Sequence, residues 1–152
     1  MQLGTQHDIA APIDAVFAAC TDFSALERQA LRRGIEVERT QGGNDPAKAA
    51  WRLKFAVKGK PRTLDARVER FDKPNGLTVA GQTEGMDVAL AVELIALSRV
   101  QTRMVLSVVL KPRSMTARMM VQTMKLAKCN LNGRLSRRVG DFARDIARRH
   151  QA

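Results

Sequence analysis

Few residues in this sequence have the type and spacing that metal binding or nucleophilic catalysis requires. The two cysteines, Cys20 and Cys129, are more than a hundred residues apart, and the two histidines, His7 and His150, lie near opposite ends of the chain. No pair has the spacing of a zinc site, so we expect no metal and no cofactor. In a reducing compartment both cysteines are expected to be free thiols in apolar settings.

Two carboxylates are the remaining candidates for acid–base chemistry. Glu93 lies in the most apolar run of the chain, residues 88–97, where an inward-facing carboxyl could act as an acid or base. Its neighbours Val92 and Leu94 are predicted to take the inner face of a strand, which leaves Glu93 outside. Asp87 is six residues away and shares that outer face. The sequence therefore assigns no catalytic residue and leaves open whether any reaction is catalysed.

Positive charge is the unusual bulk property of this chain of 152 residues. Its net charge is +11, and residues 113–152 hold 10 of the 26 Lys and Arg but only 2 of the 15 Asp and Glu. Such a basic segment can attract nucleic acid, an anionic membrane or an acidic partner, or it can be a solvated helix face. The few aromatic residues form no stacking motif, so specific nucleic-acid recognition is not expected.

The hydrophobic pattern predicts strands and short helices over the first two thirds of the chain. Residues 2–10 form a first strand that Pro12 ends, and two short helices follow, the second with Ser24 and Glu27 spaced as a capping box. From Ile35 the period changes to two, which predicts an antiparallel meander. The further strands are expected at 35–38, 51–57, 63–69, 77–83, 86–97 and 101–111, with a hairpin turn at 59–61.

The last quarter of the chain is predicted to be one amphipathic helix, after Pro112 has ended the meander. Ser114 is a suitable N-cap, and from Met115 onward apolar residues recur every three or four positions without a proline. This predicts a helix of roughly 35 residues, about 50 Å long. Gly133 and Gly140 lie inside the helix and weaken it, so they indicate close packing or a slight bend.

No targeting segment is expected in this chain. The N-terminus lacks the basic start and apolar run of a signal peptide, and the run 88–97 is too short to cross a bilayer. No linker, repeat or low-complexity tract divides the sequence. We therefore expect one cytoplasmic domain that covers residues 1–152.

The sequence after the first strand resembles a known superfamily. Ile9-Ala10-Ala11-Pro12-Ile13-Asp14-Ala15-Val16-Phe17, followed by Thr21-Asp22, is similar to the opening of START-like (SRPBCC) proteins. These include polyketide cyclases, aromatase-like proteins, plant allergens and coenzyme-Q-binding proteins. The resemblance implies an α+β helix-grip fold, in which a curved antiparallel β-sheet of about seven strands surrounds a long C-terminal α-helix. Two short helices would follow strand 1, and the element order agrees over the whole chain.

In such a fold a mostly apolar ligand cavity can open where the sheet and the helix do not fully meet. The candidate lining residues are those expected to face each other across that space. On the sheet they are Trp51, Phe55, Val88, Leu90 and Met104, and on the helix Met120, Met124, Ala127, Lys128 and Leu131. The same residues could fill an ordinary core. Lys128 could pair with an acidic ligand group, or it could extend its charge to water.

The leading hypothesis is a protein that binds a small hydrophobic molecule, lipid-like or aromatic, between the sheet and the C-terminal helix. The resemblance also allows a polyketide cyclase/dehydratase-type enzyme. A third alternative, from the charge distribution, is a basic interaction module whose C-terminal helix makes weak contact with an anionic membrane or a macromolecular partner. The identity of the ligand and the oligomeric state stay open.

Overall fold

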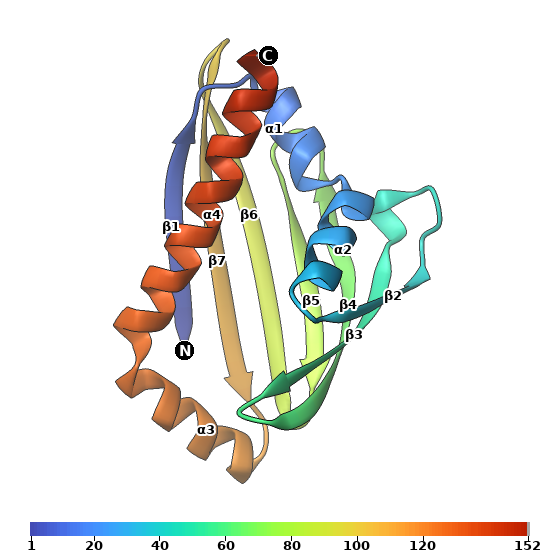
Figure 1. The fold of residues 1–152 in the computed structure, drawn as a ribbon, viewed down its shortest axis with the longest axis vertical. Coiled ribbons are helices and arrows are strands. Elements are labelled where there is room, and N and C mark those ends of the chain that lie inside the picture. Colours follow the sequence, from blue (N-terminus) through green and yellow to red (C-terminus); the bar gives the residue numbers. More distant parts are fainter. Residues whose placement is uncertain (152) are drawn as a thin grey trace.

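The computed structural model describes residues 1–151 and contains a seven-stranded antiparallel sheet (Figure 1). The strand order is β1-β7-β6-β5-β4-β3-β2, so β2 to β7 form a meander and β1 pairs with the last strand. The strands are β1 (Gln2–Ile9), β2 (Glu36–Gln41), β3 (Ala50–Val57), β4 (Lys60–Asp72), β5 (Gly76–Thr83), β6 (Met86–Ser98) and β7 (Gln101–Pro112).

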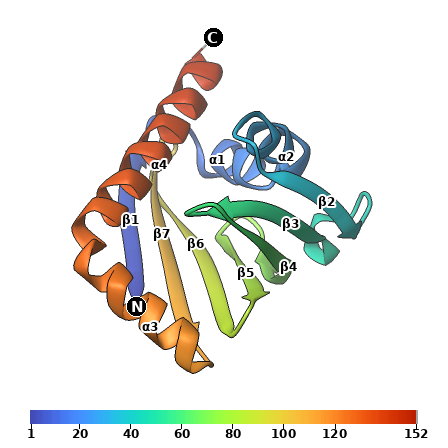
Figure 2. The same ribbon diagram turned by 60° about the horizontal axis from the view of Figure 1, so that its bottom comes forward.

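Four α-helices lie on one side of this sheet (Figures 1 and 2). They are α1 (Ile13–Cys20), α2 (Phe23–Arg32), α3 (Met115–Leu126) and α4 (Lys128–Gln151). Helix α4 packs along β1, α1 contacts β6 and β7, α2 contacts β2, and α3 contacts β7. A short 3-10 helix, η1 (Pro46–Lys48), precedes β3. The predicted helix-grip arrangement, with two short helices after the first strand, is confirmed.

Side chains alternate between the helix-covered inner face of the sheet and an uncovered outer face. The register aligns neighbouring strands so closely that single rows of residues cross five strands. The row Trp51, Ala66, Gly81, Val88 and Leu110 lies on the inner face, and the adjacent row Arg52, Asp65, Gln82, Asp87 and Lys111 lies on the outer face. The predicted alternation of the strands is therefore correct.

The buried core consists of two separate clusters on the inner face. The main cluster lies among α1, the start of α2 and the C-terminal half of α4, where Phe17 meets Phe71 edge to face with ring centroids 5.2 Å apart. A smaller cluster of Met86, Ala117 and Val121 joins α3 to the start of β6. The inner face between these clusters is less completely covered.

The prediction of one continuous helix after Ser114 is wrong, because the helix breaks at Ala127. The backbone N–H of Ala127 binds the carbonyl of Met124 at 3.0 Å, which tightens the last turn of α3 before α4 begins. Helix α3 packs on the start of β6 and on β7 while α4 packs along β1, and the two helices point in different directions (Figure 1). No proline or glycine lies at the break. We attribute the break to the packing of the two helices on different strands.

Two local predictions are also corrected, and one is confirmed. Asp22, not Ser24, caps α2, and its Oδ1 accepts the N–H of Ala25 at 3.3 Å. The β3–β4 turn is centred on Lys58 and Gly59, whose φ angles of 51° and 79° suit a two-residue hairpin turn. Ser114 caps α3 as predicted, since its Oγ accepts the N–H of Ala117 at 3.0 Å.

Candidate functional site

The inner face carries a group of half-buried apolar side chains between the two core clusters. Leu3, Val88, Leu90, Leu106 and Val108, here called the inner apolar band, belong to neither cluster. They are contiguous, because Val108 pairs with both Leu90 and Leu3, and the others lie two residues along the same strands. The band lies on the edge strand β1 and its two neighbours β7 and β6, on the face that the helices cover, where a filled core would bury apolar side chains more fully. The band is therefore the part of the inner face that the packed clusters leave partly exposed.

The five sheet residues predicted to line a cavity lie in different surroundings in the structure. Val88 and Leu90 lie in the inner apolar band. Trp51 and Met104 are only 9% and 2% exposed and belong to the main core. Phe55 is half-buried near the end of β3, where it pairs with Arg62. The structure thus brings together two of the five and places two others among packed side chains.

The residues predicted on the helix side are divided in a similar way. Met124 and Leu131 are half-buried, near the end of α3 and the start of α4. Met120 is half-buried and packs against the smaller core cluster. Ala127 and Lys128 are exposed at the break between the helices. The charge of Lys128 therefore lies in water, which was one of the two alternatives for this residue.

Trp51 is held in place by a carboxylate that the sequence pattern had assigned to a helix cap. Its indole N–H donates to Glu27 Oε2 at 2.8 Å, and Arg39 Nε donates to the same oxygen at 2.7 Å. The Trp51 ring meets Phe23 edge to face with centroids 4.8 Å apart. Partial burial opposes ionisation of Glu27, but the bonds from Arg39 and Trp51 and the charge of Arg39 outweigh it and lower its pKa. This contact anchors α2 to β3.

Two polar residues at one end of the inner face were missed by the sequence analysis. Arg62 pairs with Phe55 and so shares the inner face; its side chain is only 17% exposed. Its Nη1 donates at 3.3 Å to Glu84, a carboxylate that is itself 80% exposed. The buried Oγ1 of Thr83, next to Glu84, has no hydrogen-bond partner among the described residues. The alternation with Leu64 would have placed Arg62 on this face.

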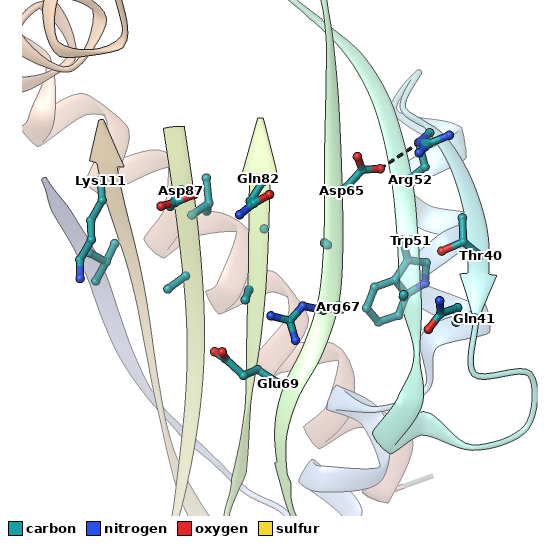
Figure 3. Close-up of a pocket in the computed structure, with 17 residues that line it drawn as sticks. Thr40, Gln41, Trp51, Arg52, Asp65, Arg67, Glu69, Gln82, Asp87 and Lys111 are labelled. Carbon is teal, nitrogen blue, oxygen red and sulfur yellow. Dashed lines mark hydrogen bonds and ion pairs between the residues drawn. The ribbon is translucent and has the colours of Figure 1, made fainter. Parts of the chain in front are cut away.

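A hollow of about 780 Å3 lies over the outer face of the sheet (Figure 3). The outer row from Arg52 to Lys111 crosses it, and small residues such as Ala80 and Ala89 lie between. Its lining is polar, with six charged residues, of which Arg52 binds Asp65 through Nε at 2.9 Å and Asp87 Oδ1 lies 3.1 Å from Arg113 Nε. A solvated face that carries so many charged side chains gives no indication of an apolar ligand.

The candidate nucleophiles and acids are not gathered into a catalytic group. Cys20 is buried, 3.8 Å from the sulfur of Met104, and burial raises the pKa of its thiol to about 12. Cys129 is exposed, so its predicted apolar setting is wrong. Glu93 is exposed on the outer face, as predicted. His7 lies between β1 and α4, where its Nε2 is 3.1 Å from Thr5 Oγ1.

Residues 1–151 contain neither a cluster of metal ligands nor a membrane-spanning helix. No three His, Cys, Asp or Glu side chains in this range lie together as a metal site would require. No helix within the same range has the length and apolar character needed to cross a membrane.

Similarity to known proteins is visible in the fold. No protein-family model and no curated protein matches this chain. The Zhui aromatase/cyclase from Streptomyces sp. R1128 superposes with a TM-score of 0.71 at 17% identity, over 98% of this chain and 94% of that one. A protein from Thermus thermophilus gives 0.67 at 16% identity over the whole of both chains. A START superfamily protein from Mycobacterium smegmatis gives 0.59 at 14% identity, over 88% of this chain and 95% of that one.

At such identities the likeness concerns the fold alone, and the fold agrees element by element with the one that the opening sequence implied. This chain has the START-like helix-grip fold, with a sheet of seven antiparallel strands, two short helices after β1 and the long helix α4 along the inner face.

Proposed function

We propose that this protein binds a small hydrophobic molecule, lipid-like or aromatic, on the inner face of its sheet beneath α3 and α4. The inner apolar band carries this proposal, because apolar side chains of β1, β7 and β6 on the helix-covered face are left half-buried between two packed clusters. A ligand that covered them would gain about 25 cal/mol for each Å2 of apolar surface removed from water.

The polar residues at the end of the same face suit a ligand with one polar or acidic group. Arg62 is mostly buried, yet its carboxylate partner Glu84 is mostly exposed and is free to turn toward solvent. Thr83 supplies a buried hydroxyl without a partner in the described chain. A mostly apolar site with a few polar groups is the usual composition of a small-molecule pocket.

A reaction in this site has less support than binding. The cyclase alternative needs an inward acid, base or nucleophile. Glu93 faces outward, Cys20 is a buried thiol with a pKa of about 12, and the inward His7 contacts the hydroxyls of Thr5 and Ser136 between β1 and α4, outside the inner apolar band. The similarity to an aromatase/cyclase is one of fold at 17% identity. We therefore propose binding and no reaction.

The proposal is tested with the uncharged fluorescent probe phenylnaphthylamine and two tryptophan substitutions. Val88→Trp would fill part of the inner apolar band, whereas Ala89→Trp changes the adjacent exposed residue on the outer face of the same strand. We expect the wild-type protein and Ala89→Trp to bind the probe equally. Val88→Trp should bind it roughly tenfold more weakly, the equivalent of about 1.4 kcal/mol. Urea unfolding of each variant checks that the fold is intact.

Equal binding by Val88→Trp and the wild type would contradict the proposal, and so would selective loss of binding in Ala89→Trp, which would move the site to the outer hollow. The natural ligand is sought by native mass spectrometry of the protein purified from its own host. A co-purifying small molecule that Val88→Trp no longer retains is the expected result.

A further inference from the structure

Helix α3 has apolar side chains on two opposite faces, and only one of these faces contacts the rest of the chain. On the inner side Ala117 and Val121 are 2% and 4% exposed and pack on Met86. On the other side Met115, Met119 and Leu126 are 72%, 68% and 90% exposed. Single exposed apolar side chains are common on protein surfaces, but several that gather in one place mark an interaction surface.

These three exposed residues form one stripe along the helix. Met119 follows Met115 by four positions, and Leu126 follows Met119 by seven, so all three project from the same side of α3. The stripe lies opposite the buried Ala117 and Val121. Helix α3 occupies one end of the molecule, turned away from the axis of α4, and no other element lies over its outer side in either view (Figures 1 and 2).

The chain segment that carries the stripe is strongly basic. Residues 113–140 contain seven Lys and Arg and no Asp or Glu. Arg118 and Lys125 lie along one flank of the stripe, and Lys128 follows directly after the helix break; all three are exposed and have no ion-pair partner in the described part of the chain. The outer side of α3 therefore combines an apolar stripe with uncompensated positive charge.

We propose that this outer side of α3, defined by Met115, Met119 and Leu126 with Arg118, Lys125 and Lys128, is a docking surface for an anionic lipid bilayer. A helix that lies in a membrane interface buries an apolar stripe at the boundary of the acyl chains and places cations against the headgroups. Methionine suits such a fluid surface, because its flexible side chain adapts to irregular neighbours. The inference stands on α3 alone and does not depend on the proposed ligand site.

Charge decides between a membrane and the other possible occupants of this surface. A second copy of the chain would bring two basic flanks together and be repelled. Nucleic acid would satisfy the cations but would leave three exposed apolar side chains without a role. An anionic bilayer satisfies both features. With three apolar residues and three cations, binding is weak and reversible.

The experiment is co-sedimentation of the full chain with vesicles of phosphatidylcholine alone and of equal parts phosphatidylcholine and phosphatidylglycerol. We expect binding to the anionic vesicles and little binding to the neutral ones. The double variant Met119→Ser/Leu126→Ser should lower the affinity for anionic vesicles roughly tenfold or more, because it removes most of the inserted apolar surface. Lys125→Glu/Lys128→Glu should lower it by a similar factor.

The matched control is Val100→Ser, which replaces a 66% exposed apolar residue in the β6–β7 turn, outside α3, and should bind like the wild type. Because every substituted side chain is exposed, all variants should unfold at the wild-type temperature. The proposal is wrong if the wild type does not bind anionic vesicles, or if the Met119→Ser/Leu126→Ser variant binds them unchanged. A solution dimer that this variant disperses would instead identify a second copy as the occupant and would also overturn it.

Discussion

At the scale of single residues, Glu27 links helix α2 to strands β2 and β3 through one carboxylate oxygen. Arg39 and Trp51 both donate to Oε2, at 2.7 and 2.8 Å, and the pKa of Glu27 lies below its ordinary value of 4.5. A carboxylate with a lowered folded-state pKa stabilises the fold above its unfolded-state pKa. That contribution is lost as the pH falls through the folded-state pKa.

The first prediction follows from the lowered pKa of Glu27. Glu27→Gln should lower the free energy of unfolding at neutral pH, because the charge-assisted bonds to Arg39 and Trp51 are replaced by weaker ones. The difference from the wild type should shrink as the pH is lowered below 4.5. Urea unfolding at a series of pH values measures it, with Glu93→Gln on the exposed outer face as the control. A difference that stays constant with pH would contradict the prediction.

The second prediction concerns the two thiols, which the structure places in opposite surroundings. Cys129 is exposed, whereas Cys20 is buried and burial raises its pKa to about 12. Since the thiolate is the reactive form, a water-soluble disulfide reagent should label Cys129 rapidly in the folded protein. Cys20 should react only when the protein unfolds. Equal labelling rates in Cys20→Ala and Cys129→Ala variants would show that the buried placement of Cys20 is wrong.

The residues of the candidate site were only partly predictable from the sequence. Alternation correctly put Trp51, Val88 and Leu90 on the inner face, because side chains of a strand alternate strictly. The same alternation says nothing about which part of that face a helix covers. Trp51 became core because Phe23 and Glu27 of α2 pack on it, whereas Val88 and Leu90 stayed half-buried. Such contacts join residues far apart in the chain.

At the scale of elements, the sequence predicted the strands better than the last helix. Residues of period two, separated by turns and ended by Pro112, define β3 to β7 locally. The break at Ala127 has no such local signal. It results from two helix segments that pack on different parts of the sheet, α3 on Met86 and α4 on β1. Propensity alone would have continued the helix, and tertiary packing overrode it.

The third prediction compares the two glycines of α4. A Cβ at Gly133 would meet nothing within 4 Å, whereas a Cβ at Gly140 would lie 3.1 Å from Cε1 of His7. Gly133→Ala should therefore stabilise the protein by up to about 1 kcal/mol, the ordinary gain of alanine over glycine inside a helix. Gly140→Ala should gain less or should destabilise, because the His7 ring must move. Thermal unfolding of both variants measures the difference.

A His7→Ala background tests whether the His7 ring is what limits the substitution at Gly140. Replacing His7 by Ala removes the ring that the new Cβ would meet, so Gly140→Ala should be more favourable in that background. A gain at Gly140 equal to that at Gly133 in the wild-type background would show that the close packing of β1 against α4 is not a constraint.

At the scale of the whole molecule, the two helices of the C-terminal segment both carry positive charge but differ in the apolar surface that they expose. The exposed large apolar side chains of this segment lie on α3, whereas α4, within the described residues, exposes mainly basic side chains. Arg144 and Arg149 are ion-paired with Asp141 and Asp145, but Arg134 and Arg137 are exposed without a partner in the described chain. Two kinds of polyanion contact are therefore separable by experiment.

The last prediction is that α4 binds duplex DNA weakly and without sequence preference. Such binding should weaken steeply with salt, because each phosphate contact releases counterions and contributes about 0.9 to the slope of log affinity against log salt. Arg134→Glu/Arg137→Glu should lower the affinity and reduce that slope by up to about 2.

Met119→Ser/Leu126→Ser should leave the DNA affinity unchanged, because it removes apolar surface and no charge. The same charge change at Lys54 and Lys58, exposed residues at the β3–β4 hairpin, is the control. DNA binding that persists at high salt, where charges on the surface are screened beyond about 3 Å, would show that α4 is more than a solvated basic face.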